Sequence, residues 1–359
     1  MTTLWNPTTV GTMQLPHRLA MSPMTRDRAL PDGTPGPSAP RYYAQRASLG
    51  LLITEGTQPN DDGQGYLLTP GSYTDEHVRG WRAVADAVHD AGGHLAIQLM
   101  HTGRMSHPDN TPHHRQPVAP SAIAPGAQMF TGTGMQDIPE PRALTTEEVR
   151  TTVEDFRRAA ARAVEAGADA VEIHGANGYL VQQFLAEGSN HRTDEYGGSP
   201  SARAQFAIEV TRALVEEIGA ERTGLRLSPA SAEGGVDHAG IDEGETGRET
   251  YRHLISEIAP LRPAYLHLLH HGDELLLKEI RELWPTALLV NRPGRELDAI
   301  ADDIDAGLAD VVTVGAWALA NPDLPERLRS GADLNEPDPA TFYGGGDEGY
   351  VDYPTLATA

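Results

Sequence analysis

Eight short apolar segments with strand character alternate with segments of helical periodicity along almost the whole chain. The eight predicted strands are Arg18–Met24, Leu51–Gly56, His94–Met100, Ala170–Gly175, Thr223–Pro229, Tyr265–His270, Ala287–Asn291 and Asp310–Gly315. Apolar residues at helical spacing predict helices over 75–91, 145–166, 200–218, 245–259, 273–284, 296–306 and 322–329. Alternating strands and helices need a parallel sheet. Eight such units predict an α/β fold, a (β/α)8 or TIM barrel.

A doubly wound parallel sheet is the alternative arrangement for such a chain. That fold carries a glycine-rich turn after its first strand, whereas the first predicted strand here leads into Thr25-Arg26-Asp27. A G-x-G-x-x-G pattern does occur over 344–349, but it follows the last predicted helix and no strand precedes it. We therefore do not expect this pattern to bind a nucleotide.

The barrel leaves roughly a hundred residues to place, since it needs about 250. About forty of them, residues 102–144, separate the third strand from its helix and are rich in Pro, Gly, His and Ser. Long insertions of this kind usually act as lids or binding loops, and we expect a lid here. The rest form a tail over 333–359, and we expect one domain over 1–359.

Composition excludes several classes of function. The chain has 28 Lys+Arg against 51 Asp+Glu, a net charge of −23, which disfavours binding to nucleic acid or to an anionic membrane. It has no cysteine, so disulfides, iron–sulfur clusters, thiolate metal sites and cysteine nucleophiles are excluded. Its one lysine, Lys278, lies on a predicted helix, which disfavours Schiff-base chemistry. No signal-like or membrane-spanning segment is visible, so we expect a cytoplasmic protein.

The polar residues at the carboxyl ends of the strands are the candidates for chemistry, because barrel active sites lie there. They are Met24, Thr25, Arg26, Gly56, Thr57, Gln98, His101, His174, Asn177, Tyr179, Arg226, Ser228, Asn291 and Arg292. This set contains hydrogen-bond donors and few carboxylates. It differs from the carboxylate pairs of glycosidases and of hard-metal sites, and it suits a flat, polar, partly anionic cofactor.

The segment after the fourth strand is the most informative. His174 and Asn177 could aim two N–H donors at one oxygen above the barrel, stabilising an enolate formed by hydride addition to a conjugated alkene. Tyr179 carries an O–H that could then protonate the α-carbon. The alternative is that His174 caps the strand end and Asn177 merely holds a left-handed turn. Spacing alone leaves both open.

Several motifs occur together and in order between Leu4 and Pro354. They are Met21-Ser22-Pro23-Met24-Thr25-Arg26, Thr54-Glu55-Gly56-Thr57-Gln58, Gln98-Leu99-Met100-His101-Thr102-Gly103-Arg104, His174-Gly175-Ala176-Asn177-Gly178-Tyr179-Leu180, the segment 188–198 and Asn321-Pro322-Asp323-Leu324. In these motifs the chain resembles the Old Yellow Enzyme family, FMN-dependent ene reductases on a (β/α)8 barrel. Thr25 and the absence of cysteine match the branch of that family with threonine at this position.

The resemblance implies roles for individual residues toward FMN. Pro23, Met24 and Thr25 would lie along the flavin, and Gly56 would let the backbone approach its ring. Gln98 would bind the pyrimidine edge. The cation of Arg226 would face the N1/C2 side, where negative charge accumulates on reduction.

The resemblance also implies the reaction. NADPH or NADH would reduce FMN, and an alkene activated by a carbonyl or nitro group would then bind in the same place, giving ping-pong kinetics. His174 and Asn177 would hold the substrate oxygen, and Tyr179 would give the proton. The remaining candidates for substrate walls are Tyr66, Phe130, Tyr343 and Met100. Met100 stands where the family usually has tryptophan, which should open the pocket to bulkier substrates.

A second departure from the family concerns the FMN phosphate. The last strand usually ends in Gly-Arg, but here it ends in Gly315-Ala316. The phosphate must then rely on backbone amides around Gly294, Gly315 and Ala316, with Arg292 or Arg295 in place of the missing arginine. We interpret the two changes as one relocated arginine; the alternative is weakened FMN binding.

Other interpretations remain open at this stage. On the same scaffold they are a nitro-compound or nitrate-ester reductase and a biosynthetic enone isomerase; outside it they are a flavin-free barrel lyase or hydrolase and a binding protein. We expect no metal site at His267, His270 and His271, because positions i and i+3 of a strand face opposite sides. The acidic run 302–305 should be a solvated helix face. We expect a monomer or homodimer with small-molecule partners.

Overall fold

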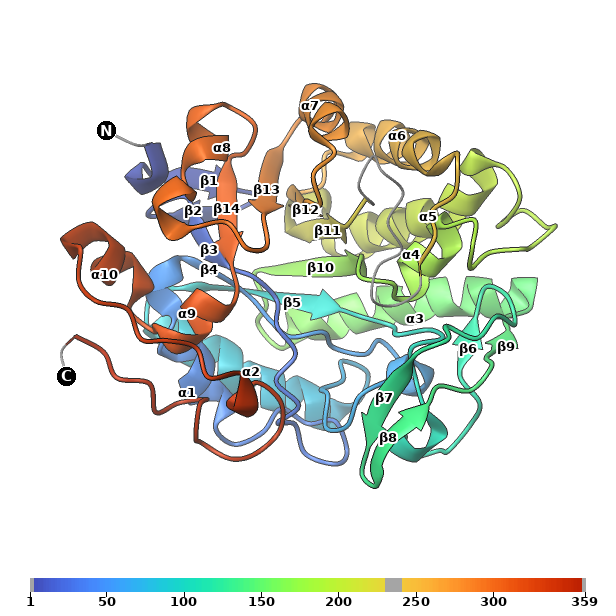
Figure 1. Ribbon diagram of the computed structural model, residues 1–359, viewed down its shortest axis with the longest axis horizontal. Coiled ribbons are helices and arrows are strands. Elements are labelled where there is room, and N and C mark those ends of the chain that lie inside the picture. The colour runs from blue at the N-terminus through green and yellow to red at the C-terminus, as the bar shows by residue number, and fades with distance from the viewer. Residues whose placement is uncertain (1–2, 230–240, 357–359) are drawn as a thin grey trace.

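The computed structural model describes residues 3–229 and 241–356, and eight parallel strands close into a barrel at its centre (Figure 1). The strands are β3 (Leu19–Met21), β4 (Leu51–Ile53), β5 (His94–Leu99), β10 (Ala170–Gly175), β11 (Thr223–Leu227), β12 (Tyr265–Leu269), β13 (Ala287–Asn291) and β14 (Val311–Val314). They follow the chain around the barrel, and β14 pairs with β3 to close it. The barrel prediction is confirmed, and the doubly wound alternative is wrong.

Helices pack around the outside of the barrel. They are α1 (Ala39–Ala44), α2 (Asp75–Asp90), α3 (Thr146–Glu165), α4 (Leu180–Leu185), α5 (Pro200–Ile218), α6 (Gly247–Ile258), α7 (Glu274–Leu283), α8 (Asp302–Asp305), α9 (Ala316–Ala320) and α10 (Leu324–Ser330). Thr145 caps α3: its side chain accepts from Glu148 N, and Thr145 N donates to the Glu148 carboxylate. The helix predicted over 296–306 is instead a 3-10 turn, Leu297–Ala299, followed by the single turn of α8.

The amino-terminal end of the barrel is closed by a hairpin that was not predicted from the sequence. Its strands are β1 (Thr8–Val10) and β2 (Met13–Leu15). The buried side chains of Val10, Met13 and Leu15 join an apolar cluster with Leu51 and Leu289 from barrel strands. Because this end is filled, polar residues at the carboxyl ends of the strands are the ones placed to meet a ligand.

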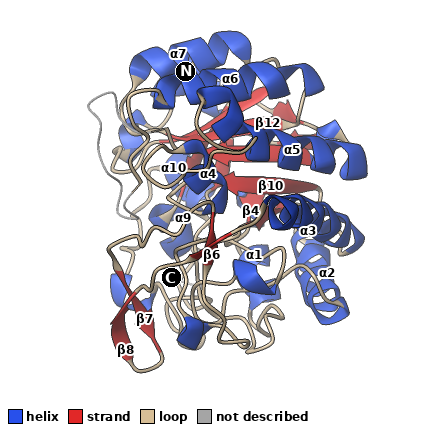
Figure 2. Cartoon of the chain, turned by 90° about the vertical axis from the view of Figure 1, so that its right-hand side faces the viewer, coloured by secondary structure: helices blue, strands red, loops and turns tan. Residues whose placement is uncertain are grey.

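The insertion over 102–144 has more regular structure than expected. It contains the antiparallel hairpin β7 (Gln128–Thr131) and β8 (Gly134–Asp137), which stands out from the rest of the chain (Figure 2). Short strands β6 (Val118–Ala119) and β9 (Arg142–Ala143) pair in parallel at its base. Only two residues separate β7 from β8, whereas β6 and β9 come from before and after that hairpin in the insertion. The lid function stays a prediction.

Two buried arginines hold the carboxyl-terminal tail on the mouth side of the barrel. Arg26, just after β3, donates through Nε to Phe342 O and through Nη2 to Gly349 O, both at 3.0 Å. Arg46 donates to Tyr350 O at 3.2 Å. The G-x-G-x-x-G pattern lies within this tail, and Gly344 N donates back to Arg26 O at 2.9 Å. The glycine-rich segment therefore serves tail docking, with no strand before it.

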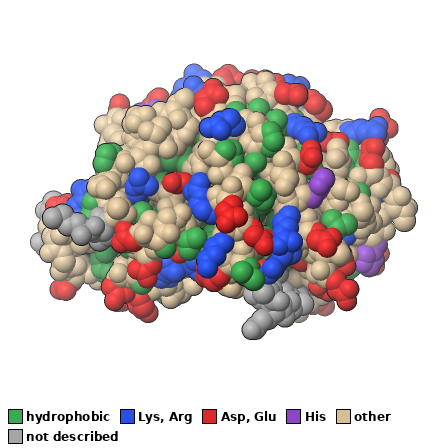
Figure 3. All heavy atoms as spheres, turned by 90° about the horizontal axis from the view of Figure 1, so that it is seen from above, with side chains coloured by type: hydrophobic (Ala, Val, Ile, Leu, Met, Phe, Trp, Pro, Cys, Tyr) green, Lys and Arg blue, Asp and Glu red, His purple; other side chains and the backbone are tan. Residues whose placement is uncertain are grey.

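The surface carries both signs of charge. On the face seen in Figure 3, basic and acidic side chains are interspersed rather than gathered into one basic patch. Among residues 3–229 and 241–356, no helix is long and apolar enough to cross a membrane.

Candidate functional site

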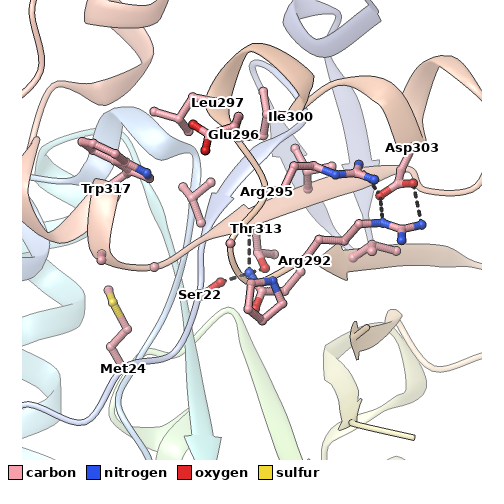
Figure 4. A pocket seen from close by; sticks show the side chains of 18 of the residues that line it. Ser22, Met24, Arg292, Arg295, Glu296, Leu297, Ile300, Asp303, Thr313 and Trp317 are labelled. Atoms are coloured by element: carbon pink, nitrogen blue, oxygen red, sulfur yellow. Dashed lines mark hydrogen bonds and ion pairs between the residues drawn. The ribbon is translucent and has the colours of Figure 1, made fainter. Parts of the chain in front are cut away.

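A cavity of about 510 Å³ opens at the carboxyl ends of β3, β11, β13 and β14. Its lining includes nine predicted cofactor residues or their neighbours: Pro23, Met24, Arg226, Arg292, Pro293, Gly294, Arg295, Gly315 and Ala316. Figure 4 shows Met24 and Trp317 on one side of it, and Arg292 and Arg295 on the other. Thr25, Gly56 and Gln98 are not among the lining residues. The fold thus brings most of the predicted FMN set together from four strands.

Arg226 presents unused donors to this cavity. Within the described part of the chain its side chain makes no hydrogen bond, and its Nε is buried without a partner. Burial lowers the pKa of Arg226, while the nearby Glu172 raises it and keeps the guanidinium charged. A buried cation with free donors stabilises an electron-rich ligand edge strongly, because the local dielectric is low.

The other two arginines come from one tight turn. Arg295 N donates to Arg292 O at 3.2 Å, Pro293 takes the second position, and Gly294 has φ of 77° at the third. This is the pattern of a type II turn, in which proline presets one residue and glycine tolerates the positive φ of the next. The turn brings both arginines to the carboxylate of Asp303 on α8 (Figure 4).

The two arginines differ in how many donors remain free. Arg292 uses Nε and Nη2 on Asp303 at 2.7 and 2.9 Å, and Nη1 and Nη2 on Glu274 at 2.6 and 3.2 Å. Arg295 makes one such contact, from Nη1 to Asp303 at 2.8 Å. Burial opposes the charge of Arg292, but the hydrogen bonds to Glu274 and Asp303 raise its pKa. Arg295 is thus the freer donor of the pair.

Asp303 corrects one expectation from the sequence. It belongs to the acidic run 302–305, which was expected to be solvated, yet Asp303 is only 3 % exposed. A one-turn helix turns this carboxylate inward because two guanidinium groups neutralise it there.

His174 lies at the end of β10 as a neutral donor. Its Nδ1 accepts from Ala176 N at 3.2 Å, so the proton of the neutral ring is on Nε2. Burial lowers the pKa of His174 well below its ordinary value, and the charge of Arg226 lowers it further. His174 can therefore donate a hydrogen bond without carrying a charge.

Asn177 occupies a left-handed position with φ of 53°. Its backbone N–H donates to Ser228 Oγ at 2.9 Å, which leaves its side chain uncommitted to this turn. The turn-holding interpretation of Asn177 is therefore correct for the backbone. It does not exclude a role for the side-chain amide.

Tyr179 lies beside His174, with ring centroids 5.0 Å apart. Its hydroxyl is 2.9 Å from that of Tyr66, so one of the two donates to the other. Burial raises the pKa of Tyr179 well above its ordinary value, and Tyr66, Tyr343 and Asp27 raise it further. The proton is thus held on Tyr179 until a strong base forms next to it.

The walls around these tyrosines differ in part from the prediction. Met129 on β7 packs into a cluster that contacts Tyr66 and Tyr179, whereas its neighbour Phe130 is 60 % exposed. Alternate residues of a strand face opposite sides, so Met129 rather than Phe130 reaches the site. Tyr343 is 65 % exposed on the tail.

Met100 does not stand free in a widened pocket. Its side chain is buried against Gly56, where any added Cβ would collide with the Met100 thioether. Any side chain at position 56 would therefore require Met100 to move.

Two carboxyl groups near the site were not singled out from the sequence. Asp27 follows Arg26 with φ of 53°, and its buried Oδ1 has no partner in the described residues. Burial, aided by Glu55, raises the pKa of Asp27 to about 8, and burial raises that of Glu55 to about 7. The signal available in the sequence was the placement of each acid just beyond a strand end.

The residues present fit FMN and offer no obvious metal site. Arg226 supplies an orphaned buried donor, and the turn at 292–295 supplies cationic donors next to flexible glycine backbone. No cluster of three or more His, Cys, Asp or Glu that could hold a metal occurs within 3–229 and 241–356. His267 instead binds Glu172 and Thr313.

The family model and the individual relatives found by comparison with known proteins agree with one another. The sequence model of the NADH:flavin oxidoreductase / NADH oxidase family matches residues 3–335. A Leishmania infantum protein named "Probable flavin mononucleotide-dependent alkene reductase" is 39 % identical over 98 % of this chain and 96 % of its own. Arabidopsis thaliana 12-oxophytodienoate reductase 2 is 37 % identical, with 98 % and 96 % covered.

Solved structures agree. Morphinone reductase in complex with tetrahydroNAD superposes with a TM-score of 0.92 at 43 % identity, covering 98 % of this chain and 97 % of that one. The old yellow enzyme homologue from Zymomonas mobilis gives 0.93 at 35 % identity, covering 99 % and 100 %. With the family match over most of its length, this chain belongs to the NADH:flavin oxidoreductase / NADH oxidase family, that is, the Old Yellow Enzyme family.

Proposed function

We propose that this protein is an FMN-dependent alkene reductase that uses NADPH or NADH to reduce C=C bonds conjugated to a carbonyl or nitro group. One observation carries the proposal: a neutral imidazole donor, His174, and a protonated phenol, Tyr179, lie side by side next to the buried cation Arg226. The names of the Leishmania and Arabidopsis relatives support the reaction class. The tetrahydroNAD complex of morphinone reductase supports a nicotinamide donor.

FMN would be held by two groups of residues. Pro23, Met24, Thr25, Gly56, Gln98 and Arg226 would take the ring system. The backbone around Gly294, Gly315 and Ala316, with Arg292 and Arg295, would take the phosphate. Arg295 has the donors to bind a phosphate directly. Arg292 is already engaged by two carboxylates and would mainly fix the position of Asp303.

The substrate would be held and protonated by this chain's own side chains. His174 Nε2–H and the Asn177 side-chain amide donate to the carbonyl or nitro oxygen and stabilise the negative charge that develops there. Bound FMN, once reduced, would be the source of the hydride for the β-carbon. Tyr179 gives its proton to the α-carbon, and Tyr66, within hydrogen-bond distance, stabilises the resulting phenolate.

The first test is an anaerobic absorbance spectrum of the purified protein, taken before NADPH, after NADPH and after 2-cyclohexenone. We expect a flavin band that bleaches with NADPH and returns with the enone. A colourless protein that stays colourless when incubated with FMN would overturn the proposal.

A Tyr179→Phe variant tests the proton donor. It should slow flavin reoxidation by the enone about 100-fold, in the range of general acid catalysis, and leave flavin reduction by NADPH nearly unchanged. Stopped-flow measurement of the two half-reactions separates these rates. Equal losses in both would rule out the role assigned to Tyr179.

A further inference from the structure

A chain of buried polar side chains crosses the barrel interior next to the cavity. Gln98 Nε2 lies 2.7 Å from Glu172 Oε1, and Glu172 Oε2 lies 2.9 Å from His267 Nδ1. His267 Nε2 lies 3.0 Å from Thr313 Oγ1, to which Ser22 Oγ donates at 2.8 Å. Each of these five residues is at most 4 % exposed. Ser22 and Thr313 also line the cavity.

The protons in this chain can be placed by elimination. Burial lowers the pKa of His267, so its ring is neutral and has one N–H. A carboxylate only accepts hydrogen bonds, so the N–H is on Nδ1 and faces Glu172, while Nε2 accepts from Thr313. With Ser22 donating to Thr313, successive donors all point toward Glu172, and such aligned hydrogen bonds strengthen one another.

The same argument orients the amide of Gln98. Its NH2 group must face the Glu172 carboxylate, which turns its carbonyl oxygen away from that contact. An amide oxygen can accept from the imide N–H of a flavin, whereas an amide nitrogen cannot. Glu172 thereby selects the orientation of Gln98 that suits the pyrimidine edge of FMN.

Glu172 also acts on Arg226. The two side chains come from adjacent strands: Glu172 pairs in register with Gly224 on β11, two residues before Arg226. On its other side Glu172 is in register with Gln98 on β5. Because the Arg226 side chain makes no hydrogen bond in the described part of the chain, the charge of Glu172 is its main local compensation.

We propose that Glu172 is a positioning residue that orients Gln98 and counterbalances Arg226, and thereby sets the reduction potential of bound FMN. The inference rests on the proposed function. Two-electron reduction of FMN places negative charge near its N1/C2 edge. A negative Glu172 weakens the preference of Arg226 for that reduced form, so the potential should be lower with Glu172 than without its charge.

The Glu172→Gln variant removes the charge and keeps the shape. The new amide can accept from Gln98 and donate to His267 Nδ1; the ring then changes tautomer, and its Nε2–H donates to Thr313 Oγ1, whose hydroxyl proton turns away. We expect reduced FMN to bind about tenfold more tightly relative to oxidised FMN than in the wild type, which raises the two-electron midpoint potential by about 30 mV. Dye-equilibrated spectroelectrochemical titration measures this shift.

Two variants serve as controls. Glu172→Asp keeps the charge but shortens the reach to Gln98, so FMN should bind several-fold more weakly with the potential unchanged. Glu216→Gln, on the exposed face of α5, makes the same change in net charge at a distance and should alter neither quantity.

The outcomes separate the proposals. A wild type that binds FMN, with an unchanged or lowered potential in Glu172→Gln, overturns the inference alone. If Glu172→Gln does not fold, Glu172→Asp decides: unaltered FMN affinity in that variant overturns the inference. A wild type that binds no FMN overturns both this inference and the proposed function.

Discussion

Arg226 and Arg292 line the same cavity and are both largely buried, yet their guanidinium groups differ in how many hydrogen bonds they make. The Arg226 side chain makes no hydrogen bond among the described residues, and burial lowers its pKa. Asp303 and Glu274 accept hydrogen bonds from two edges of the Arg292 guanidinium. These hydrogen bonds raise the pKa of Arg292, although burial lowers it. The first is a cation held ready for a ligand, and the second is a structural ion pair.

The difference teaches that an arginine in a pocket is not by itself a ligand-binding residue. The free energy of desolvating a cation is already offset where carboxylates surround it, so a ligand gains little there. Where no such partner exists, a ligand that supplies electron-rich acceptors stabilises the cation and binds tightly. Arg295, with one contact to Asp303, falls between the two cases.

The largest effect should follow from removing the uncommitted cation. Arg226→Met should weaken FMN binding about 100-fold, since hydrogen bonds to a charged group contribute about 3 kcal/mol. Fluorescence titration of the apoprotein with FMN measures this. If the variant binds FMN like the wild type, Arg226 is not a ligand-binding cation and the contrast with Arg292 fails.

A smaller and more specific effect should separate Arg295 from Arg292. Arg295→Ala should weaken FMN about tenfold and leave riboflavin unaffected, because riboflavin lacks the phosphate. Arg292→Ala should instead lower the thermal midpoint, as it leaves Asp303 and Glu274 without this cation, and change the ratio of FMN to riboflavin affinity less. The opposite ranking of that ratio would make Arg292 the phosphate ligand.

The last prediction concerns stability rather than FMN binding and extends the comparison to carboxyl groups. Asp27 lacks a partner on Oδ1, and its pKa is raised to about 8, so the folded chain keeps a proton that the unfolded chain loses near pH 4. The free energy of unfolding should therefore fall as pH rises from about 4 to about 8, and level off above that. Asp27→Asn tolerates the left-handed backbone and should remove the part of this fall that Asp27 contributes, about 1.4 kcal/mol for each pH unit between its two pKa values.

Chemical denaturation of both proteins at pH 6 and pH 9 measures this difference. Parallel pH profiles for Asp27→Asn and wild type would show that Asp27 does not titrate in this range. Glu55, whose pKa is raised to about 7, contributes a fall of the same sign and remains in both proteins.

Local patterns in the sequence were enough for the barrel and for much of the site. Strand and helix periods depend on neighbouring residues, so all eight strands were located, two of them with their observed bounds. The strand-end rule then placed His174, Tyr179 and Arg226 together. The Pro-Gly pair between Arg292 and Arg295 also encodes its own turn.

Tertiary structure decided the rest, because it depends on groups distant in sequence. Three features bring together segments that are distant in the sequence: the amino-terminal hairpin, the tail held by Arg26, and the packing of Met129 near Tyr66. A hydrophobic period relates only neighbouring residues and does not predict such contacts. The sequence by itself determined which side chains reach the mouth of the barrel. Only the fold decided their charge state and free donors, since a carboxylate within about 3 Å, such as Asp303 beside Arg292, commits an arginine that the sequence leaves free.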